Sequence, residues 1–219
     1  MNHKELVNKV LIRLRERPLG ATESISSNSY AALISSLVNE AKQVVEDSWD
    51  WSGLRETISG TTTPGVFSYE LEGAGDRFKM LDALNDTSNQ FLHLIPSSTM
   101  TDYYLNNDDV PEGEPYYYSY SGTTDEGFLQ IDVYPLPDDE YTMRFNGILR
   151  TGDLVDDTDT LRVPTQPVFL LAYAYAVDER GEDMGQASAY AHQRAKSSLS
   201  DAIALDAARY PDEITWSTC

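Results

Sequence analysis

The stretch EDSWDWSGLR, residues 46–55, marks the point at which the sequence changes from a helical to an extended pattern. It places Trp49 and Trp51 two positions apart. On a helix this spacing corresponds to about 200° around the axis, whereas on a strand both rings share one face. Trp49 completes the preceding helical pattern, and Ser52 with Gly53 forms a helix stop just beyond it. We therefore expect Trp49 to belong to the helices and Trp51 to face the extended region, so that the pair forms a structural hinge.

Two segments before this point have apolar residues at helical spacing. The first covers residues 6–14 and ends at Pro18 and Gly20. The second can be capped by Ser27 or Asn28. Two amphipathic helices joined by a short link predict an antiparallel hairpin. The apolar stripe of the second helix consists of Tyr30, Leu33, Ile34, Leu37, Val38, Ala41, Val45 and Trp49.

The middle of the chain, residues 53–163, is rich in Thr, Tyr, Gly, Pro and Asp, and its apolar residues alternate with polar ones. This alternation, together with many β-branched and aromatic residues, is typical of strands. A short helix is predicted at 97–105, with Ser97 or Ser98 as its cap. Several short strands at this spacing predict a small antiparallel sandwich or barrel. The strand candidates are 65–71, 89–95, 115–121, 127–134 and 141–149.

The helical pattern returns after this region. Pro164 and Pro167 are suited to the first turn of a helix. The segment 168–177 is apolar nearly all round, which predicts a buried helix that ends at Gly181 or Gly185. A long alanine-rich helix then runs to Pro211. Its small-residue side consists of Ala187, Ala191, Ala195, Leu199, Ala202 and Ile203.

These patterns together predict an α+β fold. An antiparallel helical bundle is built from both termini, residues 1–52 and 164–210. An antiparallel β-sandwich or barrel-like domain, residues 53–163, is inserted between its two parts. Residues 211–219 form a C-terminal tail.

The charge of the chain is strongly acidic and unevenly distributed. The formal net charge is -20, but residues 1–17 carry +3 and the remainder therefore -23. Such a chain repels nucleic-acid phosphates, although a like-charged wall would let DNA slide past. The basic segment is either a solvated helix face or a docking face for an acidic neighbour, such as another copy of the subunit. Arg13 and Arg17 are the candidate contacts.

Cysteine usage and hydropathy bear on the compartment. The single cysteine, Cys219, cannot form an internal disulfide, so the fold does not depend on oxidation. Residues 1–17 are charged throughout, unlike a signal peptide. No segment approaches the ~18 apolar residues of a membrane span. We expect a protein that is made in the cytoplasm of whichever cell produces it and has no membrane partner.

No motif in the sequence predicts catalysis, a metal or a cofactor. His3, His93 and His192 lie in three regions, none with a second ligand at zinc spacing. The acidic segment 153–160 does not fit a calcium loop, because the positions that need glycine and a carboxylate hold other residues. We interpret it as a solvated loop. Nucleophile, phosphate-loop and dinucleotide motifs are missing from the sequence. Two alternatives stay open: a carbohydrate-binding β module and a hydrolase with unrecognised carboxylates.

Tyrosines are concentrated in one predicted strand. Strand spacing places Tyr116, Tyr118 and Tyr120 on one face and Tyr117 on the other. The strand is therefore either packed on both sides within one subunit or in contact with another protein, because tyrosine is enriched at interfaces. Trp216, in the C-terminal tail, is a further interface candidate.

Three motifs follow one another along the chain: VVEDSWDWSGLRETI (44–58), IPSSTMTDYYL (95–105) and LRVPTQPVFLLAYAYAVDERGED (161–183). A long alanine-rich helix comes after them. Their order and spacing resemble the head–tail adaptor, or tail tubular protein A, of short-tailed bacteriophages. The resemblance covers nearly the whole chain, and none of its motifs is catalytic.

The resemblance implies a structural virion protein without enzyme activity. Such adaptors form rings, typically dodecamers, that bind the portal protein on one side and the tail nozzle protein on the other. Genomic DNA passes through the lumen. We place the portal contact at the long C-terminal helix and Trp216, and the contact with the nozzle or a neighbouring subunit at Tyr116–Tyr120.

Overall fold

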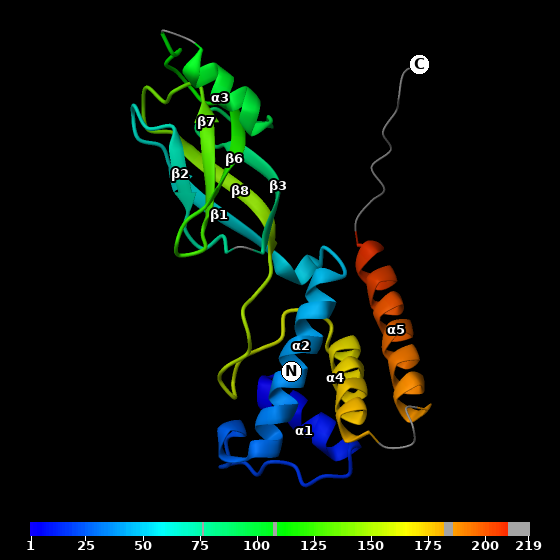
Figure 1. The fold of residues 1–219 in the computed structure, drawn as a ribbon. Helices are drawn as coiled ribbons and strands as arrows, with labels where there is room; N and C mark the ends of the chain where they lie inside the picture. The colour runs from blue at the N-terminus through cyan, green and yellow to red at the C-terminus, as the bar shows by residue number, and fades with distance from the viewer. Residues whose placement is uncertain (76, 107–108, 182–185, 210–219) are drawn as a thin grey trace, which may run out of the picture. The chain divides into compact units, whose positions relative to one another are not determined.

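The computed structural model describes residues 1–75, 77–106, 109–181 and 186–209, and it divides the chain into two compact units (Figure 1). The helical unit comprises Met1–Gly53 and Thr151–Cys219, and the β unit comprises Leu54–Arg150. Helices and two sheets are both present, so the predicted α+β class is confirmed. The tail 211–219, with Trp216, lies outside the described residues.

The helical unit contains four α-helices drawn from both ends of the described chain. In it, α4 packs against both α2 and α5, and α1 packs against α2 and α4 (Figure 1). Short 3-10 turns lie at Ile25–Ser27 and Ser52–Leu54. The helices are α1 (His3–Arg13), α2 (Ser29–Asp47), α4 (Thr165–Arg180) and α5 (Gln186–Ala207).

Local capping explains where these helices begin and end. Asn2 caps α1 in a capping box with Glu5, which satisfies two backbone donors. Of the two predicted caps for α2, Asn28 is the one used, because its side chain accepts from the first turn. Gly181 ends α4 in the left-handed conformation, with φ 61°, as glycine readily does.

The end of α2 differs from the expectation. The helix stops at Asp47, so Trp49 lies beyond it and does not complete the helical stripe. Trp51 is 1% exposed, and its indole Nε1 donates to the Val45 carbonyl at 2.6 Å. The ring is therefore bonded to the last turn of α2, within the helical unit, and this contact differs from the expected orientation toward the extended region. The role of the two tryptophans as a hinge stays a prediction.

The β unit is a sandwich of two four-stranded sheets. One sheet has the order β1 (Arg55–Thr61), β8 (Thr142–Leu149), β3 (Phe78–Asn85), β4 (Gln90–Phe91). The other has the order β2 (Ser68–Leu71), β7 (Leu129–Tyr134), β6 (Tyr117–Thr123), β5 (His93–Leu94). Neighbouring strands are antiparallel except for β5 and β6. The core between the sheets includes Leu71, Phe78, Tyr118, Ile131, Val133, Met143 and Phe145.

Several strand predictions need correction. The candidate 89–95 is split, because Gln90–Phe91 pairs with β3 and His93–Leu94 pairs with β6 in the other sheet. Two strands, β1 and β3, were not predicted. β1 is an edge strand with almost all its residues exposed, so its sequence has no apolar alternation.

The predicted short helix is present as α3 (Ser97–Leu105), which packs against β6. Its cap position is Pro96, without a side-chain hydrogen bond, so the predicted serine caps are wrong.

The second border of the β domain also differs from the expectation. We expected residues 53–163 in that domain, but residues 151–163 belong to the helical unit. Polar side chains on α2 hold the backbone of this segment, which we call the return segment. The helical unit therefore contains more of the chain than its helical periodicity indicates.

Gly147 in β8 provides a test of sandwich packing. A Cβ built there would meet the Phe78 ring and lie 2.6 Å from the Lys79 carbonyl oxygen. Gly147→Ala should therefore lower the free energy of unfolding by ~1–3 kcal/mol, measured by urea denaturation. Gly60→Ala in the adjacent β1 is the matched control, since its Cβ would meet no atom within 4 Å. Equal stability of the two variants would contradict this packing.

Candidate assembly surfaces and their supporting network

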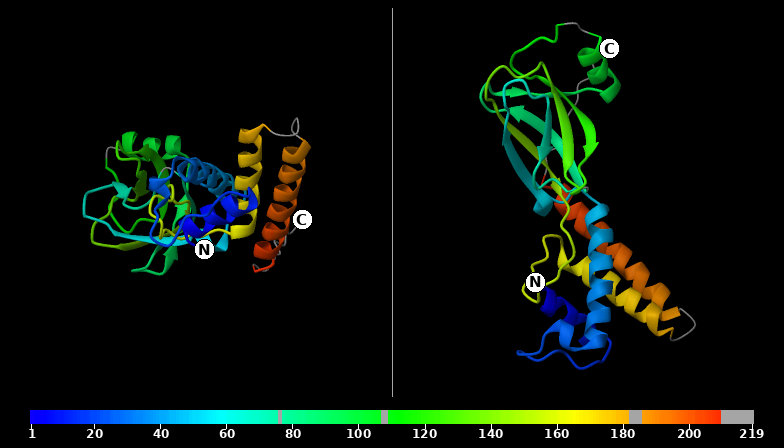
Figure 2. Two further views of the ribbon diagram at one scale, coloured as in Figure 1. Left: turned by 90° about the horizontal axis from the view of Figure 1, so that it is seen from below. Right: turned by 60° about the vertical axis from the view of Figure 1, so that its left-hand side comes forward.

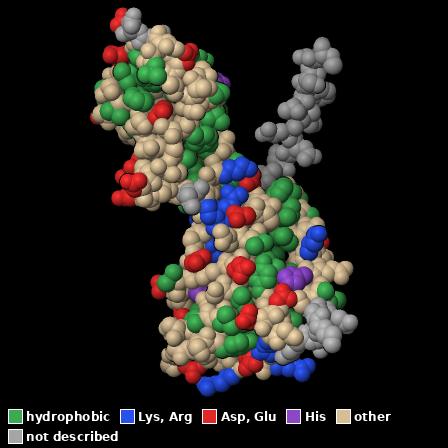
Figure 3. Space-filling view, in the orientation of Figure 1, with side chains coloured by type: hydrophobic (Ala, Val, Ile, Leu, Met, Phe, Trp, Pro, Cys, Tyr) green, Lys and Arg blue, Asp and Glu red, His purple; other side chains and the backbone are tan. Residues whose placement is uncertain are grey.

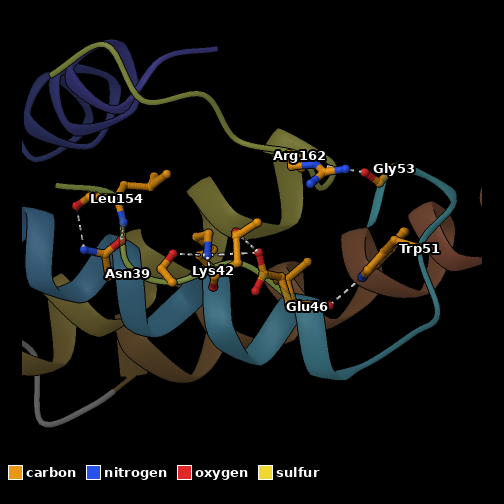
Figure 4. A network of polar contacts seen from close by, with 10 residues as sticks. Asn39, Lys42, Glu46, Trp51, Gly53, Leu154 and Arg162 are labelled. Atoms are coloured by element: carbon orange, nitrogen blue, oxygen red, sulfur yellow. Dashed lines mark hydrogen bonds and ion pairs between the residues drawn. The ribbon is translucent and has the colours of Figure 1, made fainter. Parts of the chain in front are cut away.

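A buried ion pair on α2 anchors the return segment (Figure 4). Lys42 Nζ and Glu46 Oε1 are 2.9 Å apart, and their side chains are 2% and 0% exposed. Lys42 also donates to the carbonyls of Thr151 (2.9 Å) and Gly152 (2.8 Å). Glu46 accepts from the Thr151 hydroxyl at 2.9 Å. The pair thus fixes the chain where it re-enters the helical unit after β8.

Further polar contacts extend this anchoring along the segment. The Asn39 side chain donates to the Leu154 carbonyl (3.1 Å) and accepts from the Leu154 amide (2.9 Å). Arg162 donates from Nε to the Gly53 carbonyl at 3.2 Å. A side chain at Gly53 would collide with the Arg162 carbonyl, so glycine is needed for this close approach. Figure 4 shows these contacts following α2 from its middle to beyond its end.

The acidic segment 153–160 is a largely exposed loop, as expected, and its own carboxylates also hold it in one conformation. The Asp159 carboxylate accepts from the amides of Val155 (2.7 Å) and Asp156 (2.8 Å). These bonds stabilise the charged form and so hold the pKa of Asp159 below its usual value. Asp157 accepts from the Ser24 hydroxyl, at 3.2 Å. The loop is therefore ordered by its own carboxylates, and among the described residues no cluster of three or more potential metal ligands occurs.

His3 connects the same loop to the first two helices. Its ring is 1% exposed, and Nδ1 lies 3.3 Å from the Asp156 carbonyl oxygen. A carbonyl can only accept, so Nδ1 carries the proton and Nε2 accepts from the Ser35 hydroxyl at 2.8 Å. Burial lowers the pKa of His3, against the opposing effect of the Asp156 hydrogen bond and nearby carboxylates. His3 is therefore a structural residue in its neutral form.

The basic start of the chain is partly engaged within the subunit. Arg13 lies over the Tyr173 ring of α4 at 4.5 Å, and Lys9 lies over Phe169 at 4.4 Å. Arg17 pairs with Glu23 at 2.9 Å, although its side chain is 81% exposed. Lys and Arg side chains gather at the lower edge of the helical unit (Figure 3). Arg13 and Arg17 stay predicted contacts for an acidic neighbour.

The tyrosine cluster divides into core and surface residues. Tyr118 is 5% exposed within the sandwich core, and this burial raises its pKa to about 12. The Tyr118 ring therefore cannot contact a partner, and the prediction of Tyr118 as an interface residue is wrong. Tyr117 is half-buried, in contact with the rings of Tyr103 and Tyr116. Tyr116 and Tyr120 are 41% and 39% exposed and remain available for contact.

One group of residues outside the predicted sites has the composition of a hydrolase triad. Asp178 accepts from His192 Nε2 at 2.6 Å and also from the Ser188 hydroxyl. These two bonds lower the pKa of Asp178. A nucleophilic serine would donate to the histidine, whereas here both donors bind the carboxylate. The group joins α4 to α5 and gives no support to the hydrolase alternative.

A protein-family model described as SU10 adaptor protein matches residues 1–215. The chain belongs to the SU10 adaptor protein family. It is therefore a bacteriophage adaptor, a structural component of the virion that assembles with other head–tail proteins. Among curated proteins none matches the chain. Within the described residues of this adaptor, no helix is both long and apolar enough to cross a bilayer.

The anchoring residues of the adaptor, Asn39, Lys42 and Glu46, were not predicted from the sequence. A signal for two of them was present, because Lys42 and Glu46 directly follow the stripe residues Ala41 and Val45. Charged residues one turn apart beside an apolar stripe are commonly solvated, and only their burial shows a structural role. Trp49, in contrast, is half-buried beyond α2, and its indole N–H has no partner among the described residues.

Removing one member of the buried pair should strongly destabilise the helical unit. Lys42→Met leaves Glu46 charged in an apolar environment and frees the return segment. The free energy of unfolding should fall by ~3–5 kcal/mol, measured by urea denaturation with tryptophan fluorescence. The double variant Lys42→Met/Glu46→Leu should lose less than the sum of the single variants, because no charge is left unpaired. Lys196→Met, at an exposed position of α5, is the control. A comparable loss of stability there would contradict the structural role of the buried pair.

His3 should make the stability of the helical unit depend on pH. Its folded pKa is lowered from 6.5, so below about pH 6.5 the unfolded chain binds a proton that the folded chain resists. The stabilisation is complete above that pH and is lost as the pH falls through the folded pKa. His3→Gln should flatten the pH dependence of urea unfolding below about pH 6.5. His93→Gln, an exposed histidine of the β unit, is the control; a slope unchanged by His3→Gln would contradict the prediction.

Proposed function

We propose that this adaptor is the head-to-tail connector of a short-tailed phage, similar to tail tubular protein A. In this role it forms a ring below the portal protein and links the portal to the tail nozzle protein. The ring binds no specific DNA sequence. The observation that carries the proposal is the family match over residues 1–215, which spans both compact units. Two units with separate cores suit a subunit that must meet different partners at once.

The helical unit supports the ring part of the proposal. Its outermost helix, α5, packs mainly on α4 and leaves other side chains exposed. Tyr190 and Leu205 on this helix are 67% and 73% exposed. Both side chains are accessible to a neighbouring subunit. A ring subunit must bury two lateral faces, each of roughly 800 Å² in a standard interface.

The charge of the chain suits a DNA passage. With a net charge of -20, the subunit repels the phosphate groups of DNA. Tight binding to DNA is driven by counterions that basic side chains release from the phosphates, and an acidic surface does not provide this effect. Genomic DNA could then pass through the lumen without sequence-specific binding. The basic segment 1–17 would instead meet acidic protein surfaces.

The partner contacts are assigned to different parts of the chain. The exposed tyrosines of the β unit, Tyr116 and Tyr120, are proposed to meet the nozzle protein or a neighbouring subunit. Hydrophobic side chains are frequent on the visible face of this unit, where Lys and Arg are sparse (Figure 3). The portal contact is proposed for the long C-terminal helix α5 and Trp216.

The proposal is tested by measuring the mass of the purified adaptor alone and after mixing with purified portal protein. We expect a discrete ring, a dodecamer, either from the adaptor alone or on addition of portal. A permanent monomer that does not bind portal would overturn the proposal.

The same mass measurement on a chain that lacks residues 211–219 tests the portal contact. The shortened chain should stay folded by circular dichroism and lose portal binding. Unchanged binding would show that the tail and Trp216 are not the contact, while the ring proposal would stand.

A further inference from the structure

The helical unit has a hollow of about 410 Å³ beside the end of α5. Its apolar lining includes Trp51, Val163, Ala202 and Leu205. Two arginines, Arg162 and Arg209, and one carboxylate, Asp206, also line it, so the basic groups are in excess. Trp51 and Val163 are buried, whereas Leu205 is 73% exposed. An exposed leucine next to an apolar hollow is costly in water, unless another protein covers both.

Polar contacts hold the basic side of this hollow in place. Arg209 donates to the Ser52 hydroxyl at 2.7 Å and pairs with Asp206 of its own subunit at 3.2 Å. Asp206 also accepts from the Ser52 amide at 2.9 Å. Arg162 is bonded to the Gly53 carbonyl, as described above. Both guanidinium groups are therefore positioned before any partner arrives, which lowers the entropy cost of binding.

The acidic loop of the same unit presents a complementary shape. Val155 is 79% exposed, although the loop around it is ordered by Asp159 and Asn39. Asp153 and Asp156, on either side along the chain, are exposed as well. An ordered loop that exposes a valine between carboxylates is suited to insertion into an apolar hollow whose charged lining has two arginines against one aspartate.

The loop and the hollow lie on different sides of the helical unit. The loop is bonded to α2 and to the start of α1, whereas α5 packs on α4, which lies against α2. Figure 1 shows the loop and α5 on opposite sides of α2, and the left-hand view of Figure 2 shows α4 between α5 and the other helices. A contact between them must therefore join two copies head to tail. Such heterologous contacts generate closed rings when the rotation closes.

We propose that Val155 of one subunit inserts into the hollow of the next copy in the ring. Asp153 and Asp156 then face the neighbouring copy's Arg162 and Arg209. The occupant is a second copy of this chain, because the loop supplies both the apolar tip and the charge that the hollow requires. This inference rests on the proposed ring and specifies which surfaces form its lateral contact.

Cysteine cross-linking tests the contact directly. In a Cys219→Ser background, Val155→Cys and Leu205→Cys are combined, and the protein is assembled with portal and mildly oxidised. A disulfide forms only between close cysteines, so a ladder of covalent multimers up to ring size is expected on non-reducing gels. The control combines Leu205→Cys with Val44→Cys, since Val44 is also exposed, at 43%, but lies on α2. It should give no ladder.

A charge exchange provides a second, independent readout. Asp156→Arg alone and Arg209→Glu alone should each raise the concentration needed for ring formation about tenfold, because like charges then face each other. The double variant should recover most of the loss. Each single variant is first checked by circular dichroism, so that loss of assembly is not loss of folding.

The outcomes separate this contact from the ring itself. If the unmodified adaptor forms rings but the Val155/Leu205 cysteine pair gives no ladder, the contact is overturned and the ring stands. A ladder of equal strength from the Val44 control, or no recovery in the charge-exchanged double variant, also overturns the contact. If the unmodified adaptor forms no ring with portal, both proposals are overturned.

Discussion

The buried ion pair of Lys42 and Glu46 is the constraint on which the helical unit depends. Removing two charges from water costs several kcal/mol per ion, and their mutual attraction offsets this only when their other hydrogen bonds are satisfied. Here Lys42 donates to the Thr151 and Gly152 carbonyls and Glu46 Oε1 accepts from the Thr151 hydroxyl, on a segment more than a hundred residues away in the chain. The pair therefore ties the folding of α2 to the position of the return segment. A purely apolar contact could not fix the backbone register in this way, because it has no directional preference.

The surfaces proposed for assembly follow from this anchoring. The return segment leads from Thr151 through the acidic loop to Arg162, so its position determines both the exposed Val155 and one side of the hollow. Asn39 and His3 bind backbone carbonyls of the loop. Gly53 has no side chain, which lets the Arg162 backbone approach closely. One polar network thus positions both surfaces of the proposed contact between subunits. In the proposed ring, where contacts between subunits form at a defined angle, such rigidity would lower the cost of association.

Much of the fold could be predicted from local patterns. Apolar periodicity indicated all four helices of the helical unit, and alternation indicated most strands of the β unit, because both signals depend on one element burying one face. The edge strand β1 was not predicted because it is exposed on both faces and so lacks apolar alternation. The sequence also does not show that residues 89–95 divide between two sheets, because strand pairing depends on residues far away in the chain. Tyr118 looked like an interface residue for a similar reason. Its spacing is the same whether its face meets a partner or the opposing sheet.

The sequence by itself determined the α+β class, the helical ends around a β-rich middle, the acidic character of the chain and the resemblance to phage adaptors. These follow from composition, periodicity and motif order, which are local or additive properties. Only the tertiary structure decided that residues 151–163 belong with the helices, that Lys42 and Glu46 are buried, and that Val155 stands exposed on an ordered loop. Each of these depends on contacts between residues far apart in the chain, and burial, not residue type, determines whether a charge or an apolar side chain serves packing or assembly.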